Sequence, residues 1–484
     1  MKPAALERAI ETGRAPVLAA VRERGSYVAE CAAMFPSVTP VCATAIATGV
    51  RQDEHQIPAM CWYDRADGRY VDYGSSFASS RRLGFSRQLK DLIYNLNGEH
   101  LPADVPTIFE RLDDAGVRTA GTTYLIYRGR HEHRPARDSP LSRLAGTVIR
   151  RPVMGPQELF YADVFASRET GCSSTLGLPG SRDQHTGCVG AHLLEHDLCD
   201  FLLFSLPDND THSHKFGPEA QVASIAEADR QLERLAHAAG GVEAFLDSWA
   251  VIAVADHSHA PVEKTIGLEG AIGARFAVLS PNDRRAADAE VALCPSQRSA
   301  QLYALGEQAA ARELIVPRLV EAALEVDGVE LACFRAPDGD GVIARAGGGE
   351  LRFAPGTSLE DPRGGRWRVH GDFAVLDARV DGVRFLSPDY PDALARVWAA
   401  LECPTSGDVL LSAAAGREFP DWGGVDHVGG GSHGSLHASD SLGALVFCGV
   451  EAPAERAEGG HWSIRDIAPM ALGHFVGRDG ERLL

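Results

Sequence analysis

Two almost uninterrupted apolar runs constrain the fold of this chain more than any other feature. They occupy residues 200–206 (DFLLFSL) and 249–255 (WAVIAVA). Runs of this length, with apolar side chains on both faces, are typical of parallel strands that are covered on both sides. The intervening residues 222–240 have the spacing of an amphipathic helix. Strand, helix and strand in this order predict an α/β protein with a doubly wound, mostly parallel sheet.

The rest of the chain extends this pattern and adds one region of a different kind. Helical spacing is found in residues 3–12, 16–24, 41–47, 105–115 and 300–326, and a strand pattern in residues 25–35. Residues 167–192 are rich in Gly, Ser and Cys and predict a surface excursion. Residues 329–385 hold short strand patterns with many Gly and Pro. We therefore expect a core domain formed by residues 1–328 and 386–484, with residues 329–385 inserted as a smaller β-rich subdomain.

Composition and charge limit the classes of function. The chain has 484 residues, 45% of them hydrophobic, which is ordinary for a globular protein. Its net charge of −19 argues against nucleic-acid binding, because phosphate backbones require a basic surface. The ten cysteines are scattered without a CxxC pair, so we expect a reducing, cytoplasmic environment rather than a disulfide framework. No apolar run approaches the ~18–20 residues of a membrane span.

Acidic and imidazole side chains follow both apolar runs at the point where each run ends. In open α/β sheets, ligands gather outside the carboxyl ends of the strands. Carboxylate and imidazole together suit zinc or another borderline divalent metal. The first set is Asp208, Asp210, His212 and His214, the second is Asp256, His257 and His259, and a glycine-rich loop at residues 423–434 adds His433.

A threonine precedes the short helix predicted at residues 41–47. Thr39 would lie at or next to the N-cap, with Pro40 in the first turn and Gly49 ending the helix. A helix N-terminus offers free amides and partial positive charge, which favours binding of a phosphate group. Taken alone, a Thr-Pro pair most often only caps a helix.

Four segments in chain order resemble motifs of the type I phosphodiesterase/nucleotide pyrophosphatase branch of the alkaline phosphatase superfamily. FPSVTPVCATAIATGVRQDEHQI resembles the segment that carries the nucleophilic Thr, with a Phe-Pro pair before it and Thr-Gly and His after it. DNDTHSHKFGP resembles the Asp-x-x-x-His-x-x-Gly-Pro element, which selects Asp210 and His214 over Asp208 and His212. VADHSH resembles the Asp-His pair, and GGSHGS the last His-Gly.

This resemblance implies a fold, a metal site and a reaction. The fold is a three-layer α/β/α sandwich with a mostly parallel sheet. One divalent cation is expected on Asp210, His214 and His433, and a second on Asp256, His257 and Thr39 together with an N-terminal aspartate. The cations would be zinc or alternatively manganese, ~3.5–4 Å apart. Thr39 would attack phosphorus and form a phospho-threonine intermediate. The expected substrate is a small phosphate ester or nucleotide with a phosphodiester or pyrophosphate bond.

The sequence departs from the family pattern at two points. The phosphate-contacting Asn expected three residues after the nucleophile is Cys42, which cannot donate a comparable hydrogen bond, and Tyr63 is a further candidate for the substrate pocket. The N-terminal aspartate normally ends the first strand in a pattern whose tail Met1-Lys2-Pro3 resembles. We expect that strand and its aspartate upstream of Met1. Without them, the alternative is a degenerate family member that binds a metal or ligand with little catalysis.

Other hydrolase classes fit less well. Gly430-Gly431-Ser432-His433-Gly434 matches the GxSxG nucleophile elbow, but that motif requires a strand immediately before the serine, and residues 423–430 are a poor strand. A sulfatase would carry a modifiable Cys or Ser in a C/S-x-P-x-R context, which is absent around Thr39. A cofactor-independent phosphoglycerate mutase would use serine as the nucleophile.

Overall fold

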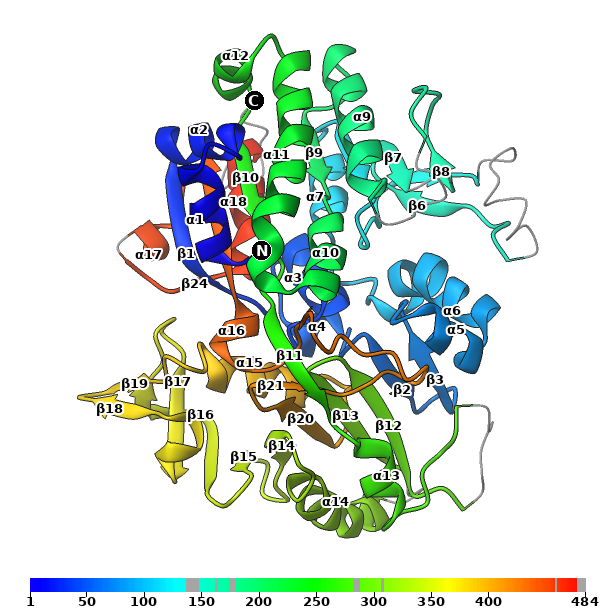
Figure 1. Cartoon of the computed structure of the whole chain (residues 1–484), viewed down its shortest axis with the longest axis vertical. Helices are drawn as coiled ribbons and strands as arrows, with labels where there is room; N and C mark the ends of the chain where they lie inside the picture. The colour runs from blue at the N-terminus through cyan, green and yellow to red at the C-terminus, as the bar shows by residue number, and fades with distance from the viewer. Residues whose placement is uncertain are drawn as a thin grey trace.

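The structure is a computed structural model that describes residues 1–135, 148–161, 164–173, 180–281, 288–305, 309–457 and 459–476, with the backbone alone for residues 309–313. Helices and strands alternate along much of the chain, as Figure 1 shows, and confirm a mixed α/β protein.

Two four-stranded sheets carry the apolar runs that dominate the sequence. The first has the order β10 (Val251–Val254), β23 (Leu442–Cys448), β1 (Ser26–Ala32) and β24 (Trp462–Ser463). The second has the order β8 (Phe165–Ala166), β7 (Glu158–Tyr161), β4 (Thr119–Thr122) and β9 (Phe201–Phe204). Only the β1–β24, β4–β7 and β4–β9 pairs are parallel, whereas β1–β23, β10–β23 and β7–β8 are antiparallel. The first sheet is therefore mixed, with more antiparallel than parallel pairs, whereas the second is mostly parallel.

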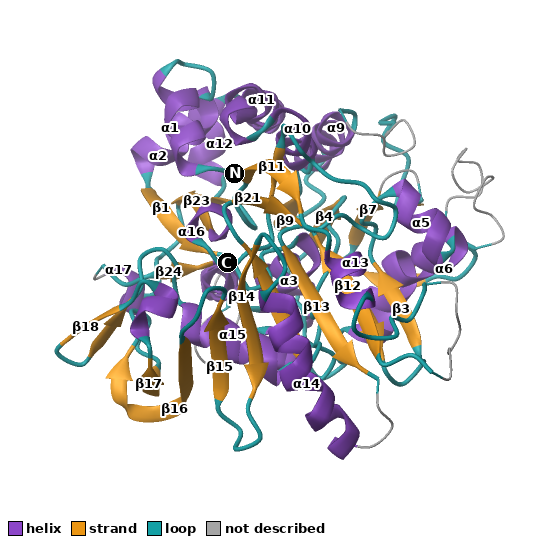
Figure 2. Ribbon diagram, turned by 60° about the horizontal axis from the view of Figure 1, so that its bottom comes forward, coloured by secondary structure: helices purple, strands orange, loops and turns teal. Residues whose placement is uncertain are grey.

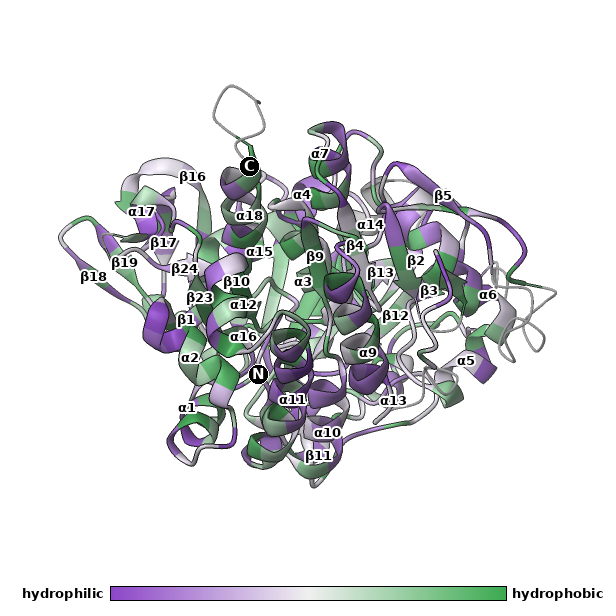
Figure 3. Ribbon diagram, turned by 90° about the horizontal axis from the view of Figure 1, so that it is seen from above, coloured by the Kyte–Doolittle hydropathy of each residue, from purple (hydrophilic) through white to green (hydrophobic). Residues whose placement is uncertain are grey.

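Helices pack on both faces of these sheets (Figure 3). One face of β10 and β23 meets α1 (Pro3–Glu11), α2 (Pro16–Arg24), α11 (Gln221–Ala238) and α12 (Val242–Ser248), through side chains such as Leu6, Leu18, Ile225 and Phe245. The opposite face meets α3 (Thr39–Thr48), α7 (Ile108–Asp114) and α18 (Ile467–Phe475). Next to α11 lie α9 (Arg182–Glu195) and α10 (Asp208–Phe216).

A third, nine-stranded sheet forms the other end of the molecule (Figure 2). Its order is β12 (Val291–Ser296), β13 (Ser299–Ala304), β20 (Val409–Ala413), β14 (Val329–Arg335), β15 (Gly341–Arg345), β16 (Glu350–Glu360), β19 (Arg384–Leu386) and β18 (Arg379–Asp381), and β17 (Arg366–Gly371) pairs with β16. The strands of residues 329–385 thus continue a sheet that residues 291–304 and 409–413 begin. The division into domains stays a prediction. Helices α14 (Ala309–Leu324) and α15 (Ala393–Glu402) pack against this sheet.

Shorter elements connect these layers. They are α4 (Gln52–His55), β2 (Cys61–Asp64), β3 (Arg69–Asp72), α5 (Phe77–Leu83), α6 (Phe85–Lys90), the π-helix η1 (Asp91–His100), β5 (His131–His133), β6 (Val153–Gly155), η3 (Pro218–Ala220), β11 (Ala260–Thr265), α13 (Leu268–Gly273), η4 (Phe373–Leu376), β21 (Gly416–Glu418), β22 (Gly431–Ser432), α16 (Ala438–Ser441), α17 (Ala454–Ala457) and η5 (Ile464–Asp466). In the part of the chain that the structure describes, no helix has the length and apolar content needed to cross a membrane.

Two local predictions are wrong. Residues 299–304 form strand β13, so the predicted helix over 300–326 begins only at α14. The excursion predicted at 167–192 contains the first eleven residues of α9, since that helix begins at Arg182. Cys172 and Cys188 form a disulfide, which ties the middle of α9 to the segment before the helix, while the other eight cysteines are free and buried.

Among the residues that the structure describes, no strand joins the two four-stranded sheets to each other. Strand β9 ends one of them and β10 ends the other. Residues of both strands line a cavity of about 1050 Å³. Each apolar residue of β9 and β10 is partly exposed, although the sequence predicts fully buried strands.

Candidate active site

Helix α10 begins directly after strand β9 and places two polar side chains on one face. Pro207 occupies the N-cap, and Gly217, with φ of 82°, ends the helix. Asp210 and His214 are four residues apart, so their side chains lie one above the other on the same side of the helix. Asp208 instead pairs with Arg182, whose Nε donates to its Oδ1 at 2.8 Å, and the ring of His212 packs on Phe216.

A short antiparallel pair brings two further histidines to this helix. In the pairing of β11 with β22, Ala260 is opposite Ser432. His259 and His433 flank that pair, one on each strand, so the two rings lie side by side with their centroids 5.0 Å apart. Both histidines are 1% exposed.

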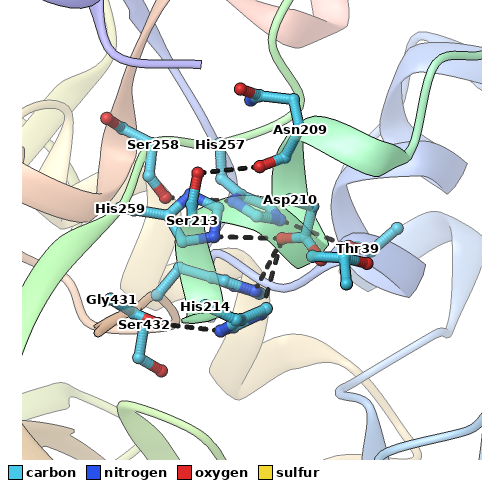
Figure 4. A network of polar contacts seen from close by, with 12 residues as sticks. Thr39, Asn209, Asp210, Ser213, His214, His257, Ser258, His259, Gly431 and Ser432 are labelled. Atoms are coloured by element: carbon cyan, nitrogen blue, oxygen red, sulfur yellow. Dashed lines mark hydrogen bonds and ion pairs between the residues drawn. The ribbon is translucent and has the colours of Figure 1, made fainter. Parts of the chain in front are cut away.

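Four ligand atoms converge at this point, as Figure 4 shows for three of the residues. Asp210 Oδ1 lies 3.5 Å from His214 Nε2, 3.0 Å from His259 Nε2 and 3.5 Å from His433 Nε2. All four ligand atoms lie within 4.8 Å of one another. We call Asp210, His214, His259 and His433 the four-ligand cluster.

Backbone carbonyls fix the ring orientation of two cluster histidines. His214 Nδ1 lies 2.8 Å from Gly431 O, and His433 Nδ1 lies 2.8 Å from Ser37 O. A carbonyl oxygen can only accept, so in each neutral ring the proton is on Nδ1 and the lone pair on Nε2 points at the cluster. This arrangement is typical of histidines that bind a metal.

The cluster has the properties of a cation site. Neither ring nitrogen of His259 makes a hydrogen bond within the described residues, and the buried Asp210 Oδ1 accepts none either. Buried polar atoms without partners are costly, and a divalent cation at their centre would satisfy all of them at once. One carboxylate and three imidazoles form a donor set suited to zinc.

The ionisation states also favour a cation. Burial of Asp210 favours its neutral form, but the three surrounding imidazoles outweigh that effect and hold its pKa well below the usual range. Burial lowers the pKa of His214 to about 4 and also lowers the pKa of His259 and His433. Near neutral pH the cluster is therefore one carboxylate facing neutral rings, the protonation state that binds metals.

The predicted nucleophile lies next to this cluster. Thr39 is the first residue of α3, and its Oγ1 is 3.2 Å from His257 Nε2. That nitrogen is also 3.3 Å from Asp256 Oδ2. The ring of His257 stacks on the ring of His433 with 3.6 Å between their centroids, so Thr39, Asp256 and His257 lie directly beside the four-ligand cluster. We call Thr39, Asp256 and His257 the threonine set.

The first turn of α3 offers fewer free amides than predicted. Pro40 has no N–H, and the amides of Val41 and Cys42 both donate to Val38 O, at 3.1 Å and 3.0 Å. A phosphate at Thr39 therefore cannot rely on these amides for binding. Positive charge from another source is required.

The N-terminal ammonium of Met1 lies near the threonine set. It donates to His257 O at 2.8 Å. Burial lowers the pKa of this amine, although the nearby Asp256 and Asp210 act in the opposite direction. Met1 and Thr39 both line the cavity between β9 and β10.

The structure brings together every predicted metal ligand but neither predicted substrate contact. The six that converge are Thr39, Asp210, His214, Asp256, His257 and His433. Cys42 is fully buried in an apolar cluster with Cys31 and Met34, and burial raises its pKa. Tyr63 packs against the rings of Tyr70 and Tyr303. Neither lines the cavity, so the expectation that they contact substrate is not supported by their positions.

The sequence did not assign two residues of the site, His259 and Glu418, to a metal site. The Nε2 of His259 faces the cluster directly. The buried Glu418 accepts from Ser432 Oγ and pairs with His427 Nδ1, both at 2.6 Å, and the His427 ring stacks on His214. Ser432 is 0% exposed, which excludes it as an accessible nucleophile. The signal for His259 was its place two residues after His257, at the start of an alternating strand.

Comparisons with known proteins agree with this geometry. The family model for type I phosphodiesterase/nucleotide pyrophosphatase matches residues 1–344. No curated protein sequence matches the chain. Among solved structures, phosphonoacetate hydrolase from Sinorhizobium meliloti 1021 in complex with phosphonoformate is similar with a TM-score of 0.52 and 17% identity, over 97% of this chain and 92% of that one. Human ectonucleotide pyrophosphatase/phosphodiesterase 5 is similar with a TM-score of 0.51 and 13% identity, over 95% and 89%.

These structural similarities show a shared fold, that of alkaline-phosphatase-like enzymes. The family match covers more than two thirds of the chain and includes Thr39, Asp210, His214, Asp256 and His257. The chain belongs to the type I phosphodiesterase/nucleotide pyrophosphatase family, whose members are phosphoric ester hydrolases.

Proposed function

We propose that this protein hydrolyses phosphodiester or pyrophosphate bonds of small phosphate esters or nucleotides, with Thr39 as the nucleophile beside two divalent cations. The observation that carries the proposal is the position of Thr39 Oγ1, which lies 3.2 Å from His257 Nε2. The ring of His257 in turn stacks on His433 of the four-ligand cluster. The fold consistent with this activity is a three-layer α/β/α sandwich, with residues 329–385 as an added β-rich part.

The residues divide into two cation sites. Asp210, His214 and His433 would hold the first cation, and His259 completes that site as a fourth donor. Asp256, His257 and Thr39 would hold the second. Bound divalent cations supply the positive charge that lowers the pKa of the attacking hydroxyl and neutralises phosphate oxygens in the transition state. Zinc suits the imidazole-rich donors best, and manganese is the alternative.

Hydrolysis then takes two displacements at phosphorus. In the first, Thr39 Oγ1 forms a bond to phosphorus, the bond to the leaving oxygen breaks, and the hydroxyl proton passes to solvent. In the second, a water molecule attacks the same phosphorus, the Oγ1–P bond breaks, and Thr39 is restored as the alcohol. The backbone carbonyls behind His214 and His433 hold the rings in place, so the site needs little rearrangement between steps.

A specific observation favours the alternative of a weakly active binding module. Within the described residues, Asp256 is the carboxylate of the threonine set, and its side chain is 32% exposed. A single, partly solvated carboxylate attracts a second cation less strongly than several buried carboxylates would. A module of this kind would hold one cation on the four-ligand cluster and turn over phosphate esters slowly.

Turnover of bis-p-nitrophenyl phosphate, with the metal content measured on the same sample, separates the two. If the protein is the proposed hydrolase, we expect about two divalent ions per chain and turnover that Thr39→Ala abolishes. Thr39→Ser should keep part of the activity, because serine retains a hydroxyl. Thr48→Ala is the matched control, since Thr48 lies on the same helix and its hydroxyl bonds the backbone of Thr44 and Val50 rather than the cluster. One ion per chain, with equal turnover in wild type and Thr39→Ala, would establish the binding module.

A further inference from the structure

Two phenylalanine rings project into solvent from the short helices α5 and α6. Phe77 is 71% exposed and Phe85 is 50% exposed, and the two rings meet edge to face with 6.4 Å between their centroids. Figure 1 shows both helices at the outer edge of the molecule, next to β2 and β3. Single exposed apolar side chains are common, whereas aromatic rings that form one exposed patch are typical of a binding surface.

The charge of this segment is opposite in sign to that of the whole chain. Residues 73–90 contain no acidic side chain, although the chain carries a net charge of −19. The same residues contain four basic side chains, Arg81, Arg82, Arg87 and Lys90. Within the described residues, none of the four forms an ion pair with a carboxylate. Their positive charge is therefore available to an external anion.

Four arginines of this region line a small pocket of about 190 Å³. They are Arg69, Arg81, Arg82 and Arg87. Contacts with the protein fix two of them, since Arg69 Nη1 donates to the buried Asp91 at 2.8 Å and Arg82 Nη1 donates to Trp422 O at 3.0 Å. We call this the arginine pocket.

The arginine pocket suits a phosphate group. Guanidinium groups present paired N–H donors that match phosphate oxygens, and hydrogen bonds between charged groups are the stronger kind. The carboxylates of Asp67 and Asp91 both pair with Arg69. Four guanidinium groups thus face two carboxylates, so the pocket keeps a net positive charge.

The combination of aromatic rings and a cationic pocket favours a lipid surface over other partners that carry phosphate. At an anionic membrane, Lys and Arg contact the headgroups while Phe enters the boundary with the acyl chains. Nucleic acid requires a more extended basic surface, which the net charge of −19 opposes. A small free phosphate compound would fill the pocket but leave both rings in water.

The same helical segment forms part of the wall of the large cavity. Helix α6 ends at Lys90 and η1 begins at the next residue. Leu89 of α6 and Leu92 and Ile93 of η1 line the cavity that Thr39 also lines. A membrane bound to α5 and α6 would therefore lie close to this cavity.

We propose that α5 and α6 form a docking surface for an anionic lipid membrane. Phe77 and Phe85 enter the boundary between headgroups and acyl chains, and the arginine pocket receives the phosphate of a lipid headgroup. The surrounding basic side chains add attraction to the negative surface of the bilayer. This surface lies outside the candidate active site, so the proposal stands whether or not Thr39 is the nucleophile.

Co-sedimentation of the full chain with lipid vesicles tests the proposal. Vesicles of phosphatidylcholine with about 30 mol% phosphatidylserine should bind the protein, and phosphatidylcholine alone should bind it at least about tenfold less tightly. Raising the salt from about 0.1 M to about 0.5 M should weaken binding to the anionic vesicles. Phe77→Ser with Phe85→Ser, and separately Arg81→Ala with Arg87→Ala, should each lower the partition constant by at least about tenfold.

A matched pair of substitutions at the opposite edge of the molecule provides the control. Val383→Ser with Arg379→Ala removes one exposed apolar and one basic side chain from the hairpin of β18 and β19 (Figure 1). This variant should bind the vesicles like wild type. Unfolding temperatures of all variants should match wild type, and amide exchange of residues 77–90 in the wild type should slow on anionic vesicles.

Three results would overturn the proposal. Binding to neither kind of vesicle, or equal binding to both, would exclude an anionic membrane as the partner. Unchanged binding in both double variants of α5 and α6 would place the contact elsewhere. The third is binding of inorganic phosphate that the Arg81 and Arg87 substitutions abolish, with vesicle binding unaffected by the Phe77 and Phe85 substitutions. That result would assign the arginine pocket to a small free anion.

Discussion

The four-ligand cluster and the threonine set lie side by side but differ in the number of side chains that could bind a metal. The cluster gathers one carboxylate and three imidazoles from α10, the segment before β11 and the loop after β22, and carbonyls orient two of its rings. The threonine set has one carboxylate, Asp256, whose side chain is 32% exposed, and its three residues line the cavity between β9 and β10.

This difference indicates that the two sets have different roles in metal binding and turnover. A cation site with four protein donors binds tightly and supports the fold, whereas a site with fewer donors keeps positions open for substrate. We therefore expect the cluster to fill first and the threonine set to determine turnover. The following experiments test this contrast, from the largest expected effect to the smallest.

Replacing the nucleophile should affect turnover and leave the cluster intact. Thr39→Ala should lower kcat for bis-p-nitrophenyl phosphate by at least about a thousandfold, because the covalent route is lost. Binding of the first cation should not change. Steady-state kinetics and metal analysis of the same preparation measure both. Retained turnover in Thr39→Ala would remove Thr39 from the mechanism.

Replacing one carboxylate in each set should separate two steps of metal binding. Titration of the metal-free protein with Co²⁺, followed by visible absorption, should show two phases. Asp210→Asn should weaken the first phase by more than about 100-fold, because a ligand is lost, and Asp256→Asn should weaken only the second. Asp208→Asn is the matched control on the same helix, since Asp208 bonds Arg182. A single phase that both variants affect equally would contradict the assignment of the two carboxylates to two separate cation sites.

The burial of the cluster should appear in the pH dependence of stability of the metal-free protein. Burial lowers the pKa of His214 to about 4, below the value of about 6.5 in an unfolded chain. Between these values the unfolded chain takes up a proton that the folded protein does not, so the free energy of unfolding falls as pH decreases from about 6.5 to about 4. Asp210, whose pKa is lowered, adds its own loss of stability only below that range.

Urea unfolding at several pH values measures this slope. His214→Gln should make the decrease between pH 6.5 and 4 shallower, because one titrating ring is gone. His55 is also buried with a pKa of about 3, and it contributes the same slope in both proteins. Identical slopes in wild type and His214→Gln would show that the ring is accessible to protons in the folded state.

The smallest effect on metal affinity is expected for Glu418, which is separated from His214 of the cluster by the ring of His427. Glu418→Gln keeps the shape of the side chain but removes the charge that holds His427, whose ring stacks on His214 at 4.0 Å. Affinity for the first cation should fall by about tenfold, as is usual for residues that orient a ligand. The second phase of the Co²⁺ titration should not move. A change confined to the second phase would place Glu418 in the other half of the site.

The sequence predicted the parts of this molecule that local spacing controls. The apolar runs before Asp210 and Asp256 require only strands, and these were confirmed as β9 and β10. The helix α10, which places Asp210 and His214 on one face, was not predicted. The spacing of Thr39, Pro40 and Gly49 likewise predicted α3, which ends with Gly49 at φ of 79°.

Features that depend on pairing between segments far apart in the chain could not be predicted from the sequence. His259 reaches the cluster because β11 pairs with β22, more than 160 residues later, and no local pattern reports that pairing. Residues 299–304 have helical spacing, yet pairing with β12 and β20 makes them a strand. The disulfide between Cys172 and Cys188 joins a loop to a helix at a sequence separation of 16, and no recognisable cysteine motif marks the pair.

Trapping of the covalent intermediate tests the central claim most directly. Protein turning over bis-p-nitrophenyl phosphate is quenched in acid, digested and mapped by mass spectrometry. We predict a nitrophenyl phosphate group on Thr39, in the peptide that contains residues 35–51, and no such group in Thr39→Ala. A phosphoryl label on any other side chain, with Thr39 unmodified, would contradict the account.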